Sequence, residues 1–278
     1  MAHHRTSRCS LLLAAILIAT AAPHTASAQI GLGLSPMRLE FGVSPGAAHS
    51  GSLTLSNESG APIRVRAELL DFYIDDQETP QFAPSYPSER ESSCRTWLTV
   101  NPMEAEVAHS HSSQVRYSLR VPPDAPPASF HCAIGFTTLP TLGETSGLGL
   151  RTAVRMVAAI YAQVGKPSIE GEVSAMSLES TAKAGAEGPQ WQAVVTIRNA
   201  GVTHFRPSGD LALLDESGAV LETILFPPLP VLPKREQRFR FRLKSSLHQQ
   251  AYTLRTRVDL GGNEIQETTM RVVPPAAK

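Results

Sequence analysis

The sequence predicts an all-β protein made of two tandem β-sandwich domains. Segments of about five to ten residues, rich in Val, Leu, Ile, Thr and aromatics, alternate with Gly, Pro, Asn and Asp, as short strands joined by turns do. No long stretch of residues 29–278 repeats its apolar residues with the helical period of 3.6. The chain of 278 residues is also long enough for two domains of ordinary size.

Residues 1–28 have the layout of a secretory signal peptide. Basic residues precede an apolar run over residues 11–19, and Ala26-Ser27-Ala28 forms a small-residue cleavage site. The run is shorter than the roughly 20 apolar residues that span a bilayer. We therefore expect a mature chain that begins at Gln29, has no transmembrane segment and lies in the periplasm.

The first domain, expected over residues 29–164, contains seven candidate strands. Seven strands in about 130 residues suit one immunoglobulin-like sandwich. The Gly31–Leu34 stretch has no strand before it, so we expect it to be a flexible arm. The candidate strands are Met37–Phe41, Ser52–Asn57, Ile63–Tyr73, Arg95–Val100, Gln114–Val121, Phe130–Thr137 and Arg151–Val164.

A second immunoglobulin-like domain is expected over residues 165–278. Gly165-Lys166-Pro167 interrupts the strand pattern and forms a short, stiff joint. Gly-containing turns then separate a further seven apolar segments. These candidate strands are Gly171–Leu178, Trp191–Asn199, Asp210–Leu214, Val220–Phe226, Arg238–Leu243, Tyr252–Leu260 and Ile265–Val273.

Two cysteines, Cys94 and Cys132, remain once the leader is removed. An even pair in an oxidising compartment favours a disulfide, which would stabilise the fold by about 3–4 kcal/mol. Two unrelated buried thiols are the alternative. We favour the disulfide because Cys132 shares a strand face with Phe130, Ile134 and Phe136.

No catalytic, phosphate-binding or metal-binding motif is present, so we expect neither an enzyme nor a bound cofactor or metal. The 25 basic and 25 acidic residues give a formal net charge of +0. The chain therefore has no excess of positive charge that would favour binding to a nucleic acid. His109 and His111 could share a strand face and bind a metal, but their Ser and Ala neighbours favour a loop.

Two charged clusters are interpreted as solvated. The acidic residues between 71 and 78 lack the spacing of a calcium loop, so we expect a solvent-exposed acidic loop. The basic residues between 238 and 244 alternate with apolar ones, which indicates the solvent-facing side of a strand. The residues are Asp71, Asp75, Asp76 and Glu78 in the first cluster, and Arg238, Arg240, Arg242 and Lys244 in the second.

The candidate strand Arg151–Val164 is apolar on both faces. It is either a central strand covered by the second domain or an edge strand whose outer face awaits a partner. We expect the latter, with partner contacts from one face and from the adjacent basic residue. One face carries Ala153, Val157, Ala159 and Tyr161; the expected contacts are Val154, Arg155, Met156, Ala158 and Ile160.

Three local patterns resemble the PapD-like periplasmic pilus chaperones. Ser35–Phe41 looks like the first strand of that family, in which an Arg precedes an aromatic residue by three positions. Ser52–Asn57 is similar to its second strand, and Val121–Asp124 to its Pro-x-Asp corner. The signal peptide, the two tandem immunoglobulin-like domains and the long apolar strand before the joint agree with this resemblance.

The resemblance implies a function in assembly. Such chaperones lend a strand to an incomplete pilin-like subunit on its way to an outer-membrane usher, and anchor its terminal carboxylate with two basic residues. Arg38 corresponds to the first of these. The second, a Lys, is replaced by Ala158 or Ala162, and Arg155 is the nearest basic residue but has the opposite parity. The sequence therefore indicates a divergent relative, with a structural or adhesive surface module as the alternative and an enzyme as the weakest.

Overall fold

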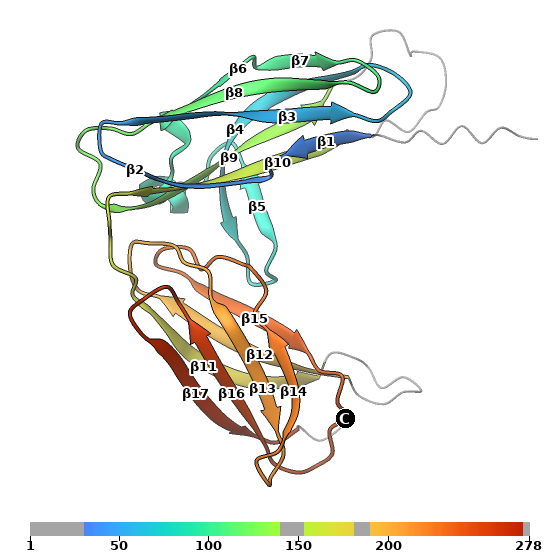
Figure 1. Cartoon of the computed structure of the whole chain (residues 1–278), viewed down its shortest axis with the longest axis vertical. Coiled ribbons are helices and arrows are strands. Elements are labelled where there is room, and N and C mark those ends of the chain that lie inside the picture. The colour runs from blue at the N-terminus through green and yellow to red at the C-terminus, as the bar shows by residue number, and fades with distance from the viewer. Residues whose placement is uncertain (1–30, 140–152, 181–189, 275–278) are drawn as a thin grey trace, which may run out of the picture.

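The computed structural model describes residues 31–139, 153–180 and 190–274 and shows two β domains, one above the other in Figure 1. The described residues form strands β1–β17 and two short 3-10 helices, which confirms the all-β prediction. No helix in these ranges is long and apolar enough to cross a membrane. The predicted signal peptide lies outside the described residues.

The first domain packs a four-stranded sheet against a six-stranded sheet. The orders are β1-β3-β8-β6 and β2-β10-β9-β4-β5, with β7 also paired to β4. Neighbouring strands are antiparallel except β2 and β10, which run parallel. The strands are β1 (Leu32–Ser35), β2 (Arg38–Val43), β3 (Ala48–Asn57), β4 (Ile63–Ile74), β5 (Pro80–Ala83), β6 (Leu98–Asn101), β7 (Glu104–Val107), β8 (Ser112–Arg120), β9 (Ala128–Thr138) and β10 (Arg155–Val164).

The described residues of this domain form ten strands where the sequence predicts seven. The additional strands β1, β5 and β7 have four residues each, too few for an alternating pattern to stand out. The expectation of a flexible arm over Gly31–Leu34 is wrong. Leu32 and Leu34 are buried in the core, and β1 pairs with β3 from Leu32 to Ser35.

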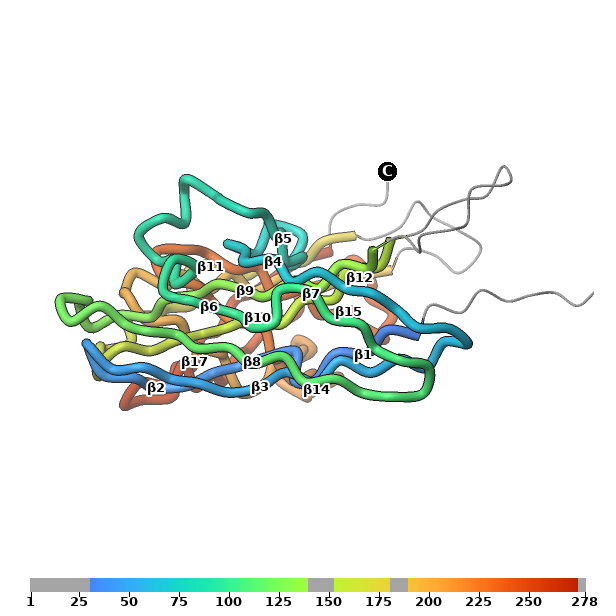
Figure 2. Tube along the Cα trace, turned by 90° about the horizontal axis from the view of Figure 1, so that it is seen from above, coloured from blue at the N-terminus to red at the C-terminus, as the bar shows by residue number. Residues whose placement is uncertain are grey.

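The predicted disulfide is present. It joins Cys94 to Cys132 with the Cα atoms 5.3 Å apart, and both residues are fully buried in the core of the first domain. Cys94 belongs to a stretch between β5 and β6 that includes the 3-10 helices η1 (Pro87–Ser92) and η2 (Arg95–Trp97). This stretch, drawn in teal in Figure 2, loops out beside the strands.

In the second domain, residues 165–180 and 190–274 form seven strands, the number that the sequence predicts. Its sheets have the orders β11-β12-β15 and β14-β13-β16-β17 and enclose a separate apolar core. The chain enters it from β10 through Gly165, whose φ of +67° favours glycine. The strands are β11 (Gly171–Ser180), β12 (Trp191–Asn199), β13 (Ser208–Leu214), β14 (Val220–Leu225), β15 (Glu236–Arg242), β16 (Tyr252–Asp259) and β17 (Ile265–Val272).

Candidate functional site

Strand β10 lies within the larger sheet of the first domain, between β2 and β9. Its even-numbered residues from Ala158 to Val164 face the core of the sandwich. On the other face, Tyr161 belongs to a second apolar cluster that includes Leu232 of the second domain, and Val157 packs against it. The apolar pattern on both faces is therefore explained by burial on both sides. The alternative of a central strand covered by the second domain is correct, and the expectation of an edge strand with an uncovered outer face is wrong.

Among the residues that the structure describes, the first half of β10 nevertheless has one edge to which no strand is paired. β2 pairs with β10 only from Ala159 onward, and the Ala159 N–H donates to the Met37 carbonyl at 3.0 Å. Because backbone groups alternate between the two sides of a strand, the Val157 N–H points to the same edge. Within the part of the chain that the structure describes, no strand pairs with Val157 there.

Strand β1 lies beside this unpaired half of β10 (Figure 1). β1 pairs with β3 in the smaller sheet and β10 pairs with β9 in the larger one, so the two sheets meet here along two strand edges. We call residues Arg155–Ala158 the open edge. It is a place where an incoming strand could extend the larger sheet, since unpaired N–H and C=O groups are templates for strand addition.

The five residues that the sequence proposes as partner contacts on this strand differ in their exposure and bonding. Met156 is partly buried against the core, whereas Ala158 and Ile160 have no exposed surface. Substituting Ile160 would therefore disrupt the domain itself. Val154 lies just before β10, and its N–H and C=O are both bonded to Thr138. The open edge thus offers backbone groups and the side chains of Arg155 and Met156.

Arg38 and Arg155 lie on the same face of the larger sheet. Arg38 pairs with Ala159, four residues further along β10 than Arg155, and residues an even number apart share a face. Arg38 is half exposed, while Arg155 donates to Glu68 at 2.8 Å. The basic residue nearest to the missing Lys is therefore on the side of Arg38, and Ala158 is on the core side.

Glu40 on β2 connects the two domains. Its Oε1 accepts a hydrogen bond from His204 Nε2 at 2.9 Å, and its Oε2 accepts one from Arg206 Nε at 3.2 Å. Arg38 Nε lies 4.0 Å from the same Oε2. The hydrogen bond from His204, outweighing partial burial and aided by Arg206, lowers the pKa of Glu40 to about 2.

Acidic side chains of the first domain pair with basic side chains of the second across the domain junction. Three carboxylates of the first domain meet three guanidinium groups of the second, an arrangement that fixes how two surfaces fit together. Arg206 also stands 4.9 Å above the ring of Tyr161, a cation–π contact. The three pairs are Glu40–Arg206, Glu78–Arg240 and Glu89–Arg235.

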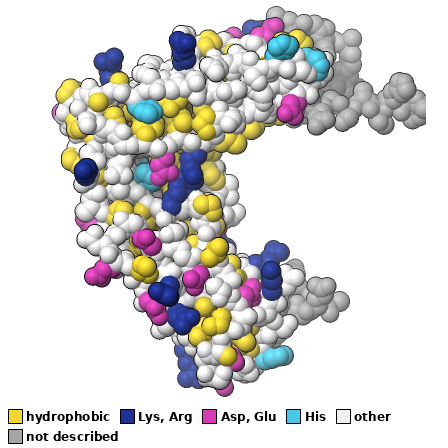
Figure 3. Space-filling view, in the orientation of Figure 1, with side chains coloured by type: hydrophobic (Ala, Val, Ile, Leu, Met, Phe, Trp, Pro, Cys, Tyr) yellow, Lys and Arg dark blue, Asp and Glu magenta, His cyan; other side chains and the backbone are white. Residues whose placement is uncertain are grey.

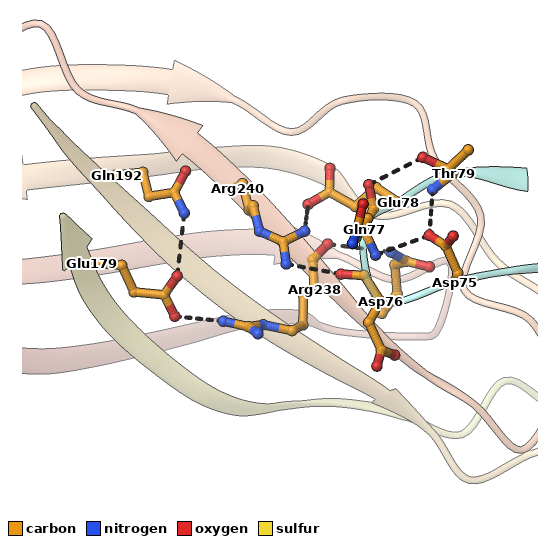
Figure 4. A network of polar contacts seen from close by, with 10 residues as sticks. Asp75, Asp76, Gln77, Glu78, Thr79, Glu179, Gln192, Arg238 and Arg240 are labelled. Carbon is orange, nitrogen blue, oxygen red and sulfur yellow. Dashed lines mark hydrogen bonds and ion pairs between the residues drawn. The ribbon is translucent and has the colours of Figure 1, made fainter. Parts of the chain in front are cut away.

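The turn between β4 and β5 makes one of these contacts (Figure 4). Arg240 on β15 donates to the Glu78 carboxylate at 2.9 Å and to the Asp76 carbonyl at 2.8 Å. The Asp75 carboxylate accepts the backbone N–H of Thr79 and shapes the turn. The expectation of a solvated acidic loop is therefore wrong for this turn, because it docks on the second domain.

The interpretation of the basic strand as solvent-facing is correct for two of its four basic residues and wrong for the other two. Besides Arg240 at the junction, Arg238 pairs with Glu179 on β11 (Figure 4). Alternation places all four side chains outside the core, and Arg242 and Lys244 are exposed, as predicted. Arg238 and Arg240, by contrast, are paired with acidic side chains. Asp71 likewise is not in solvent: it is buried and accepts a hydrogen bond from Ser93.

The surface is hollowed between the two domains (Figure 3). The junction with Glu40, His204 and Arg206 lies where the domains meet, and Arg38 on β2 belongs to the same group of charges. His109 and His111 lie in the turn before β8 and do not belong to this group of charges. Among the described residues no group of three metal-ligating side chains is present.

Solved structures similar to this chain include fimbrial chaperones. One is from a chaperone–tip adhesin complex of CFA/I fimbriae biogenesis (11% identity, 87% of this chain and 99% of that chain covered, TM-score 0.47). Others are the E. coli chaperone DraB (16%, 87% and 98%, 0.41) and a complex of the Salmonella enterica SafA pilin with the SafB chaperone (15%, 89% and 98%, 0.42). No family model and no curated protein matches the sequence.

Proposed function

We propose that this protein is a periplasmic chaperone of fimbrial or other cell-surface assembly that binds a secreted, pilin-like subunit by strand addition. The subunit's strand pairs with the open edge of β10. The observation that carries the proposal is that the Val157 N–H has no strand partner among the described residues, on an edge that is paired with β2 from Ala159 onward. Because β2 already pairs with the second half of β10, a partner strand that continues along the same edge would have its register set by that pairing.

Arg38 is the cation that fits this role. It is exposed at the domain junction and lies on the same sheet face as the open edge. A guanidinium binds a carboxylate through paired N–H donors, so Arg38 would anchor the terminal carboxylate of the subunit. The signal-peptide layout of residues 1–28 supports export to the periplasm, where an outer-membrane usher would receive the subunit.

A photo-crosslinking amino acid at Met156 tests the proposal in secreting cells. We expect an adduct with a secreted subunit, and we expect Arg38→Ala to weaken it. The control places the same amino acid at Gln114, which is exposed on β8 of the other sheet. Equal adducts at both positions would contradict strand addition. Adducts only with the cell wall or with host surfaces would favour the structural or adhesive module instead.

A further inference from the structure

The stretch between β5 and β6 belongs to the domain junction as well as to the first domain. We call residues 86–97 the clamp segment. It contains η1 and η2 and touches β9 through an isolated bridge between Ser93 and His131. Asp71 on β4 holds it from the other side, accepting from the Ser93 hydroxyl and from the Tyr86 N–H.

Glu89 is the residue of the clamp segment that reaches the second domain. Its carboxylate is almost fully buried and contacts His131 Nε2 at 3.3 Å and the Arg235 guanidinium. A buried carboxylate is tolerated only when it is paired, and removing one partner leaves an uncompensated charge. Glu89 therefore needs Arg235, which couples the position of the clamp segment to that of the second domain.

Arg235 is itself part of the apolar contact between the domains. Its guanidinium lies 5.8 Å from the centre of the Tyr73 ring on β4. Three residues earlier, Leu232 packs into the cluster that contains Phe72 and Tyr161. Loss of the Glu89–Arg235 pair would thus weaken the same surface that covers the outer face of β10.

The covalent attachment of the clamp segment lies five residues from Glu89. Cys94 bonds to Cys132, the neighbour of His131 on β9, and the Cys94 N–H donates to the His131 carbonyl at 3.2 Å. The disulfide therefore fixes the clamp segment to the strand whose histidine holds Glu89. Without it, the clamp segment would be held by hydrogen bonds, by the Asp71 contacts and by the ring contacts of Tyr86 and Trp97 at its two ends.

We infer that the Cys94–Cys132 disulfide builds the domain junction, so that the two domains dock in their fixed arrangement only in the oxidised chain. In the step that forms it, two thiols lose two protons and two electrons to a disulfide of a thiol–disulfide oxidase, which is reduced to its dithiol. This inference does not depend on strand binding.

A double-mutant cycle between the disulfide and Arg235 tests it. In the oxidised protein, we expect Arg235→Ala to raise the radius of gyration in small-angle scattering and to split one calorimetric transition into two. In the Cys94→Ala/Cys132→Ala background, both changes should already be present, and Arg235→Ala should add nothing. Arg257→Ala, which removes an exposed ion pair within the second domain, is the matched control and should have no effect in either background.

A second variant keeps the inference testable if the cysteine-free chain does not fold. Glu89→Gln in the oxidised protein should loosen the domains as Arg235→Ala does, while the disulfide remains intact. The inference is overturned if Glu89→Gln leaves scattering unchanged. It is also overturned if the cysteine-free protein folds with the compact scattering profile, or if Arg235→Ala has the same effect with and without the disulfide.

Discussion

A single carboxylate, Glu40, shows how one side chain can belong to two domains. It extends from β2 of the first domain and is held by His204 and Arg206 of the second. Nothing in the local sequence marks it, because an acidic residue on an exposed strand face is ordinary. Its partners lie more than 160 residues away, so only the docking of the domains reveals its role.

Glu40 also makes the junction sensitive to acid. Its pKa falls from 4.5 to about 2 on folding, so the stabilisation is complete above pH 4.5 and is lost as the pH falls toward 2. Because the carboxylate is partly exposed, we expect a contribution of about 1 kcal/mol after solvent screening. The unfolding free energies of the parent and Glu40→Gln should differ by a constant amount above pH 5 and converge near pH 2. A difference that grows on acidification would contradict this.

At the scale of the element, β10 combines a core strand and an open edge. Within the described ranges, its second half is paired on both sides and its first half on one side. The sequence predicts its apolar faces correctly, since alternation follows from strand geometry. It could not show where β2 stops pairing, because that depends on where the chain crosses from one sheet to the other, between Ser35 and Arg38.

Proline substitutions at two positions on the same edge distinguish the halves. Val157→Pro removes an N–H that has no partner among the described residues, so we expect the melting temperature to change by no more than about 2 °C. Ala159→Pro removes the bond to the Met37 carbonyl and should cost about 1–3 kcal/mol. Thermal unfolding of the two variants provides the comparison. Equal losses would mean that the edge is already occupied.

At the scale of the whole molecule, the two sandwiches behave as one docked unit. The strand count of the second domain, the disulfide and the absence of long helices in the described ranges follow from local patterns in the sequence, whereas the short strands β1, β5 and β7 do not. The junction does not either, because its acids and bases come from separate domains. Glu78 and Arg240 illustrate this: each looks like a solvated charge until the other is placed beside it.

Leu232 tests the apolar part of this docking. It is buried in the cluster with Phe72 and Tyr161 of the first domain, so Leu232→Ala should cost about 2–3 kcal/mol of coupling between the domains. We expect limited proteolysis to cut the joint near Gly165 faster. Leu254→Ala, in the core of the second domain alone, should lower the stability of that domain without the same increase in cleavage at the joint.

Amide hydrogen exchange at Val157 tests strand addition most directly. Residue-resolved exchange is measured for the free protein and for its purified complex with the subunit that is crosslinked at Met156. The proposed function predicts that the Val157 amide exchanges rapidly in the free protein and becomes strongly protected in the complex, while Ala159 is protected in both. Rapid exchange of Val157 in the complex, with new protection confined to another surface, would contradict it.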